Sequence, residues 1–241
     1  MEEKLLKANK ESFKNLIKKQ DDKVLEIEKD FLNRYTYDAV SLEGRNKVTY
    51  EKVTRIIELN DKTGYSEREI KEVLNHVNAF NHVIKLTNDK DRLNEEDIKD
   101  LHQILEEGIV LGGVYRNVNI QIPGATHQPP SSVKVYDRMK RLFNDLKDSN
   151  LNYFDEGLLI HATLAKIHPF LDANGRTSRL VLNFYLIKSG YIPISIKIDK
   201  RDEYFKALEE FKVNKDINPL KQFVLKLLND RYYKEILKLQ N

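Results

Sequence analysis

The chain has 241 residues, and its 41 lysines and arginines nearly balance 38 aspartates and glutamates, for a formal net charge of +3. This length suits one sizeable domain, the charge balance gives no reason to expect a nucleic-acid partner, and the lack of cysteine excludes disulfides and thiolate chemistry. Because the sequence has no apolar run of about eighteen residues and no apolar segment near its start, we expect no membrane helix, no secretory signal and a cytoplasmic protein.

Helical periodicity dominates the first half of the chain, with frequent start and stop signals. Ser66 and Glu69 have the spacing of a capping box, and Asn94 is a typical N-cap residue. The first helices are expected over residues 2–19, 24–43, 49–59, 66–86 and 94–108.

The segment around residue 120 breaks this pattern. Apolar side chains at positions 118, 120 and 122 alternate with polar ones at 119 and 121, and a Pro-Gly pair follows, which predicts a short strand and a hairpin turn. Such a strand offers unpaired backbone groups to another chain, although an ordinary surface hairpin has the same pattern. The residues concerned are Ile120, Gln121, Ile122, Pro123 and Gly124.

The second half returns to helices, two of which enclose a polar loop. A helix containing Leu158 should end near His168, because the residue before a proline is disfavoured in the α region. After the turn at Asn174, a helical pattern runs from Arg176 to Gly190. Further helices are expected over residues 132–146, 202–213 and 219–239. We therefore predict an all-α fold with one short hairpin, in which residues 1–60 form an N-terminal helical region and residues 61–241 a core.

The loop and helix start at residues 167–179 have the features of an anion site. A helix start presents free N–H groups and a partial positive charge, and Gly175 allows a ligand to approach the backbone. Arg176 and Arg179 are three residues apart and hence neighbours on one helix face. Their planar guanidinium groups suit the oxygens of a polyphosphate.

Two further side chains of this loop add chemistry. Asp172 is a candidate Mg²⁺ ligand, because that ion prefers one or two carboxylates together with phosphates and water. His168 is a candidate base for an attacking hydroxyl. Each residue alone has an ordinary structural explanation, such as a capping aspartate or a core histidine. Together in one loop they indicate a phosphate site with its own base.

The same loop resembles the signature of the Fic (filamentation induced by cAMP) family, H-P-F-x-[DE]-G-N-G-R-x-x-R, and departs from it at Ala173, where glycine is usual. Two further motifs are also similar to this family, Gly113-x-Tyr115-Arg116 and Arg201-x-x-Tyr204. The resemblance implies a mostly helical fold and transfer of AMP from ATP to a hydroxyl on a target protein.

Roles for single residues follow from the resemblance. It implies that His168 is the general base, that Asp172 holds Mg²⁺ and that residues 120–124 are a flap that aligns the target. Gly175 argues against the branch that phosphorylates its target, which carries lysine there. The implied ATP-phosphate-binding residues are Asn174, Gly175, Arg176 and Arg179.

A second motif precedes the core. Residues 37–53 resemble the N-terminal inhibitory helix of one Fic class, [ST]-x-x-x-E-[GN], with Glu43 at the glutamate position. Ala39 stands where serine or threonine is expected, and Arg45 stands where asparagine is common. The resemblance implies that Glu43 pairs with Arg179 and blocks the γ-phosphate. Because Ala39 lacks the usual hydroxyl, we expect the inhibition by Glu43 to be incomplete.

The sequence therefore predicts a protein adenylyltransferase that needs Mg²⁺ and ATP, modifies a hydroxyl-bearing target protein and itself, and is autoinhibited by Glu43. No nucleic-acid or membrane partner is expected, and a homo-oligomer is left open. Two alternatives are removal of AMP from a modified protein, with Glu43 aligning a water molecule, and a nucleotide-binding regulator with little turnover.

Overall fold

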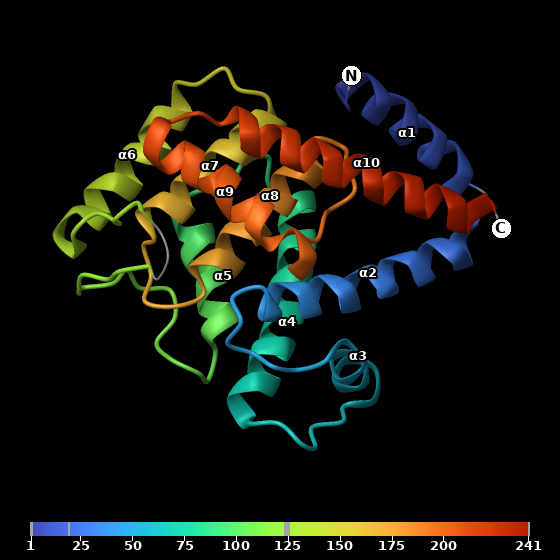
Figure 1. The fold of residues 1–241 in the computed structure, drawn as a ribbon, viewed down its shortest axis with the longest axis horizontal. Coiled ribbons are helices and arrows are strands. Elements are labelled where there is room, and N and C mark those ends of the chain that lie inside the picture. The colour runs from blue at the N-terminus through green and yellow to red at the C-terminus, as the bar shows by residue number, and fades with distance from the viewer. Residues whose placement is uncertain (1, 19, 123–125, 241) are drawn as a thin grey trace.

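The structure is a computed structural model and describes residues 2–18, 20–122 and 126–240. Within these ranges the chain consists of helices and loops (Figure 1). The elements are α1 (Glu2–Ile17), α2 (Asp21–Ser41), α3 (Tyr50–Leu59), α4 (Glu67–Asp89), α5 (Glu95–Glu106), η1 (Ser132–Lys134), α6 (Val135–Lys147), α7 (Tyr153–Ile167), α8 (Asn174–Lys188), η2 (Ile198–Lys200), α9 (Arg201–Asn214) and α10 (Asn218–Gln240). The expected all-α class is confirmed.

Local sequence signals explain where the helices begin and end. The Ser66 hydroxyl accepts a hydrogen bond from the backbone of Glu69, whose carboxylate accepts one from the Ser66 backbone, so the predicted capping box is present. Asn94 caps α5 in the same reciprocal way with Asp97. At the end of α7, His168 adopts a left-handed conformation before Pro169, with φ of 53°. These signals place the starts of α4 and α5 and the end of α7, which leads into the polar loop.

Helices α7 and α8 pack along each other at the centre of the molecule (Figure 1). On one side, Leu180 and Phe184 of α8 join an apolar cluster with side chains from α2, α4, α5 and α6. On the other side, Leu182 and Leu186 join a cluster with side chains from α1, α9 and α10. A helix with apolar contacts on both sides is held firmly in the interior. The first turn of α8 therefore has a rigid support.

Gly157 allows α7 and α8 to approach closely. A Cβ atom at this position would overlap with the side chain of Tyr185, which is fully buried. Because Tyr185 packs in the apolar cluster on that side of α8, it has little room to move.

We expect Gly157→Ala to lower the free energy of unfolding by about 1–3 kcal/mol, since overpacking forces side chains and backbone to shift. Urea denaturation followed by circular dichroism measures this change. Thr163→Ala on the same helix is the control and should stay within about 0.5 kcal/mol of the wild type. Equal stability of the two variants would contradict the close packing of α7 on α8.

The predicted hairpin is wrong for the residues that the structure describes. Residues 118–122 lie in a loop without strand, whereas Pro123 and Gly124 fall outside the described residues. Backbone groups here bond to side chains instead of to a second strand: the Val118 carbonyl accepts from Arg116, and the Asn119 side chain accepts from the backbone of Ser132. An alternating pattern alone cannot supply the partner strand that a ladder needs.

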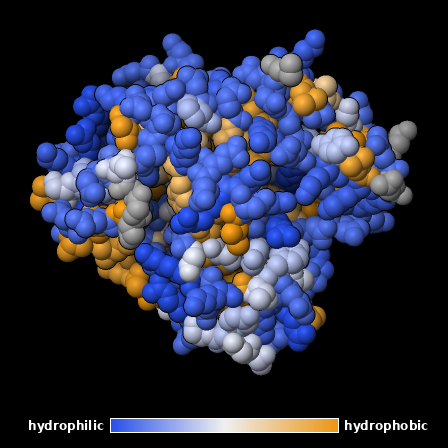
Figure 2. Space-filling view, in the orientation of Figure 1, coloured by the Kyte–Doolittle hydropathy of each residue, from blue (hydrophilic) through white to orange (hydrophobic). Residues whose placement is uncertain are grey.

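The remaining helices surround this centre. Helix α1 lies along α10, and α2 packs against α4 and α3 (Figure 1). The face in Figure 2 is mostly hydrophilic, with apolar side chains gathered at its lower left. Among the described residues, no helix is both long and apolar enough to cross a membrane. The boundary that we predicted at residue 60 stays a prediction.

Candidate active site

His168 lies at the junction of α7 and the polar loop. Its backbone N–H donates to the carbonyl of Leu164 (2.8 Å), and its own carbonyl accepts from Nε of Arg116 (2.8 Å). Burial lowers the pKa of the His168 imidazole to about 4, although the negative charge of Glu43 acts in the opposite direction. The imidazole is therefore neutral near pH 7 and able to accept a proton.

Asn174 closes the loop in front of α8. Its side-chain Oδ1 accepts from the backbone of Phe170 (2.8 Å), and its Nδ2 donates to the Phe170 carbonyl (2.9 Å) and to the Asp172 carbonyl (3.3 Å). The Asn174 amide thus holds the loop in shape. Its predicted contact with a phosphate stays a prediction, because both amide hydrogens already have partners within the loop.

Ala173 has the backbone conformation for which glycine is the usual residue. Its φ is 52°, in the left-handed region, and its side chain is buried. Left-handed backbone costs a residue with a Cβ atom about 1–2 kcal/mol. Ala173 therefore carries local strain at the turn into α8.

Arg179 is buried and pairs with Glu43. Its Nη2 donates to Oε1 of Glu43 (3.3 Å) and to the carbonyl of Ala39 (3.1 Å). The Arg179 side chain is 4% exposed and that of Glu43 is 30% exposed. The predicted partner of Glu43 is therefore in contact with it. Position 39 contributes a backbone carbonyl to this contact.

The Glu43 carboxylate lies directly over the first turn of α8. A Cβ atom on Gly175 would overlap with Oε1 of Glu43 and lie 2.8 Å from Nη1 of Arg179. Glycine is thus required for this approach. A helix start stabilises negative charge, so the carboxylate occupies the place where the local chemistry favours a phosphate.

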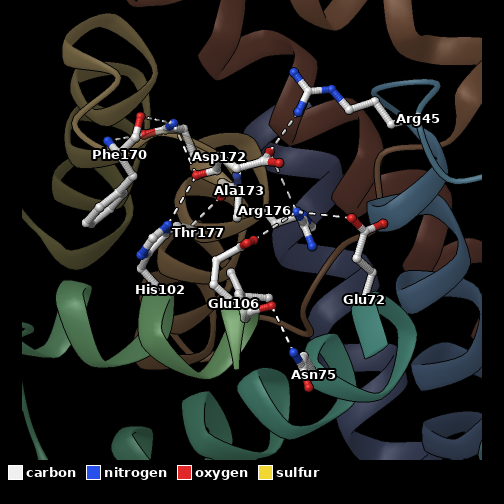
Figure 3. A network of polar contacts seen from close by, with 12 residues as sticks. Arg45, Glu72, Asn75, His102, Glu106, Phe170, Asp172, Ala173, Arg176 and Thr177 are labelled. Carbon is white, nitrogen blue, oxygen red and sulfur yellow. Dashed lines mark hydrogen bonds and ion pairs between the residues drawn. The ribbon is translucent and has the colours of Figure 1, made fainter. Parts of the chain in front are cut away.

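Arg176 points into a different group of carboxylates. Its Nη2 lies 3.1 Å from Glu106, 4.0 Å from Glu72 and 3.9 Å from Asp172 (Figure 3). Burial raises the pKa of Glu106 to about 7, although Arg176 lowers it. Arg176 and Arg179 begin on neighbouring turns but contact separate carboxylates, so the structure does not bring their guanidinium groups onto one shared anion.

Asp172 is the residue that we predicted to hold Mg²⁺. Oδ1 accepts from Arg45 (3.0 Å) and from the backbone of Ala173 (2.8 Å), and Oδ2 accepts from Arg68 (2.7 Å). Burial alone would raise the pKa of Asp172, but the Ala173 N–H and the nearby arginines together hold it below its usual value. The carboxylate is therefore ionised.

This donor set fits Mg²⁺ only as part of a nucleotide complex. The described residues contain no cluster of three or more histidines and acids that could hold a metal. One ionised carboxylate beside a helix start fits the coordination preference of Mg²⁺, which binds one or two carboxylates together with substrate phosphates. The residues present therefore suit a metal that arrives with phosphates.

Sequence reasoning missed several residues that support the loop. His102 stacks on Phe170 (3.7 Å between ring centroids), accepts from the backbone of Gly113 (2.9 Å) and donates to the Asp172 carbonyl (3.2 Å). Its spacing of four from Glu106, on one face of α5, is the only local signal that both belong to one polar patch.

A second support lies behind Arg179. The Tyr204 hydroxyl is bonded to Nε2 of His161 (3.1 Å) and interacts with the Arg179 guanidinium. Tyr204 belongs to the Arg201-x-x-Tyr204 motif of the family resemblance, but the sequence did not indicate what this side chain does. The described flap residues, Ile120, Gln121 and Ile122, lie in the loop after Arg116, and their part in docking stays a prediction.

The fold and the site together define a helical domain that presents a neutral histidine beside a basic helix start. Residues 92–186 match the family model described as Fic/DOC family. This segment of the chain is therefore a Fic/DOC family domain. The chain is 30% identical over 197 residues to protein adenylyltransferase Fic of Drosophila yakuba, which covers 79% of this chain and 39% of that protein. The chain thus spans well under half the length of this relative.

Solved structures agree with the fold. The Fic-domain-containing signalling protein of Bacteroides thetaiotaomicron superposes with a TM-score of 0.85 at 21% identity, covering 98% of this chain and 97% of that one. Fic-1 of C. elegans gives a TM-score of 0.79 at 22% identity, covering 99% and 73%. The helical architecture is therefore shared over nearly the whole chain.

Proposed function

We propose that this protein is an adenylyltransferase that moves AMP from ATP to a side-chain hydroxyl of a target protein and to itself. The observation that carries the proposal is the juxtaposition of a neutral His168 with the basic start of α8 at Gly175 and Arg179. Relatives named protein adenylyltransferase Fic support the same reaction.

The reaction divides into a proton transfer and a displacement. His168 accepts the proton of the hydroxyl while its oxygen forms a bond to the α-phosphorus, and the bond from that phosphorus to the bridging oxygen breaks, so pyrophosphate leaves. The free N–H groups of α8 and the guanidinium of Arg179 stabilise the phosphate oxygens. Asp172 would hold a Mg²⁺ ion, which neutralises phosphate charge when bound.

Intact-mass spectrometry after incubation with ATP and Mg²⁺ tests this function. The expected result is addition of AMP to the protein itself and, in a cell lysate, to at least one other protein. Omitting Mg²⁺ is the matched control and should prevent the addition. Tight ATP binding without any product would instead favour a nucleotide-binding regulator.

We also propose that Glu43 is an inhibitory residue. Its carboxylate lies on Gly175 and pairs with Arg179, which are groups that the γ-phosphate would need. ATP must break this ion pair or bind in a different position. Ala39 contributes its carbonyl to Arg179 but no side-chain hydroxyl, which supports incomplete inhibition.

Removal of AMP from a modified protein is a second candidate, favoured by one observation. The negative charge of Glu43 acts on the His168 imidazole, which supports a role for this carboxylate in orienting a water molecule for the base. Release of AMP from a pre-modified protein should then require Glu43, whereas AMP transfer should not. Comparing both rates in Glu43→Gly separates the two reactions.

The pH dependence of AMP transfer follows from the state of His168. A histidine acts as a base in its neutral form, and burial lowers the His168 pKa to about 4. We therefore expect the rate to stay constant from about pH 8 to about pH 5.5. A histidine with the ordinary pKa of about 6.5 would lose most of its activity over this range. The measurement is the initial rate of the Glu43→Gly variant at saturating nucleotide, with circular dichroism at each pH to verify folding. A half-loss of rate near pH 6.5 would contradict the low pKa.

A further inference from the structure

Both carboxylate oxygens of Asp172 are bonded to arginine side chains. Nη1 of Arg45 lies 3.0 Å from Oδ1, and Nη2 of Arg68 lies 2.7 Å from Oδ2. Figure 3 shows Arg45 reaching Asp172 from the loop that follows α2. Arg68 comes from the first turn of α4. Two segments that are far from Asp172 in the sequence thus place positive charge on the single acid of the polar loop.

The position of Arg68 is supported by a chain of polar contacts. Nε of Arg68 donates to Glu72 (3.1 Å), and the other oxygen of Glu72 accepts from Asn46 (3.0 Å). Asn46 is buried and also donates to the carbonyl of Glu69 (3.1 Å). Since Asn46 directly follows Arg45, the same short loop holds both arginines near Asp172.

These contacts compete with metal binding. Mg²⁺ demands ligands at about 2.0–2.1 Å in near-octahedral geometry, so it needs a lone pair of Asp172 that points toward the nucleotide. An arginine N–H uses such a lone pair, and a guanidinium beside a divalent cation repels it. A Mg²⁺–nucleotide complex therefore competes with Arg45 and Arg68 for the carboxylate.

We propose that Arg45 and Arg68 set the Mg²⁺ requirement of nucleotide binding by competing with the metal for the carboxylate of Asp172. The inference rests on the proposed function, which makes Asp172 the metal ligand. This competition differs from the action of Glu43. Glu43 pairs with Arg179, the arginine proposed to bind a phosphate, and leaves Asp172 untouched. One loop, residues 43–46, thus opposes both the γ-phosphate and the metal.

The expected effect is moderate. The side chains of Arg45 and Arg68 are 67% and 50% exposed, whereas that of Asp172 is 17% exposed. Ion pairs with an exposed partner shift an equilibrium by about two- to fivefold. Removing one arginine should lower the Mg²⁺ concentration needed by about this factor, and removing both should lower it by about tenfold.

Isothermal titration calorimetry with α,β-methylene ATP tests the proposal, because this analogue resists cleavage between the α and β phosphates. Its dissociation constant is measured over a series of Mg²⁺ concentrations for the wild type, Arg45→Ala, Arg68→Ala and the double variant. The quantity compared is the Mg²⁺ concentration at which half of the gain in affinity is reached. Arg55→Ala is the control. Arg55 is an exposed residue of α3 and pairs with Asp61 in the loop after this helix.

We expect the half-effective Mg²⁺ concentration to fall in the order wild type, single variants, double variant, and to stay unchanged in Arg55→Ala. In Glu43→Gly, the affinity at saturating Mg²⁺ should rise while the half-effective concentration stays near that of the wild type. An unchanged or higher Mg²⁺ requirement in the double variant would overturn the inference while leaving the proposed function intact. Absence of nucleotide binding in every protein would overturn the proposed function itself.

Discussion

His168→Ala is expected to reduce the rate of AMP transfer by about 10²- to 10⁴-fold, which is the usual effect of removing a positioned base. The dissociation constant for α,β-methylene ATP should change little, because the groups of α8 and Arg179 that we propose to bind phosphate remain. Transfer is measured by intact mass over time, and affinity by calorimetry. The variant removes a half-buried side chain at the end of α7, so circular dichroism should verify that it folds.

His82→Ala provides the matched control for this experiment, since His82 lies on α4 outside the candidate site. Its rate should equal that of the wild type. Equal modification by His168→Ala and the wild type would remove His168 from the role of base. A loss of nucleotide affinity as large as the loss of rate would instead indicate that the histidine shapes the binding site.

Glu43→Gly is expected to raise the rate of AMP transfer by about 10- to 150-fold. A hydrogen bond to a charged group contributes about 1.5–3 kcal/mol net, and a difference of about 1.4 kcal/mol changes an equilibrium tenfold. Breaking the pair between Glu43 and Arg179 therefore frees a large share of molecules to bind the γ-phosphate productively. The initial rate of self-modification at fixed ATP measures this effect.

Two further variants sharpen the test of Glu43. Glu43→Gln keeps the size of the side chain over Gly175 but removes its charge, so its rate should lie between those of the wild type and Glu43→Gly. Glu51→Gly removes an exposed acid from α3 and should leave the rate unchanged. If Glu43→Gly transfers AMP at the wild-type rate, the ion pair seen in the structure has no inhibitory role.

Much of the fold was predictable because its signals are local. The capping box at Ser66, the cap at Asn94 and the proline after His168 each fix a helix end through contacts within a few residues. The strand expected near Ile120 failed for the opposite reason. Whether an alternating segment becomes a strand depends on a partner strand, and here side chains such as Arg116 bind the backbone instead.

The candidate site was predictable only along the chain itself. The spacing of Arg176 and Arg179 correctly makes them neighbours on α8, but it cannot reveal that buried acids on α4 and α5 attract one guanidinium while Glu43 attracts the other. The two arginines that bind Asp172 were missed for the same reason. Arg68 lies more than one hundred residues earlier in the sequence, and nothing near it indicates a role at the loop.

In the proposed reaction, His168 directs a hydroxyl to the α-phosphorus of ATP. The most direct test incubates the Glu43→Gly variant and a cell lysate with ATP that carries its label either on the α-phosphate or on the γ-phosphate. We predict that protein bands acquire the α label and remain free of the γ label, and that His168→Ala introduced into the same variant removes the α label. Transfer of the γ label, or α labelling that persists without His168, would contradict this role of His168.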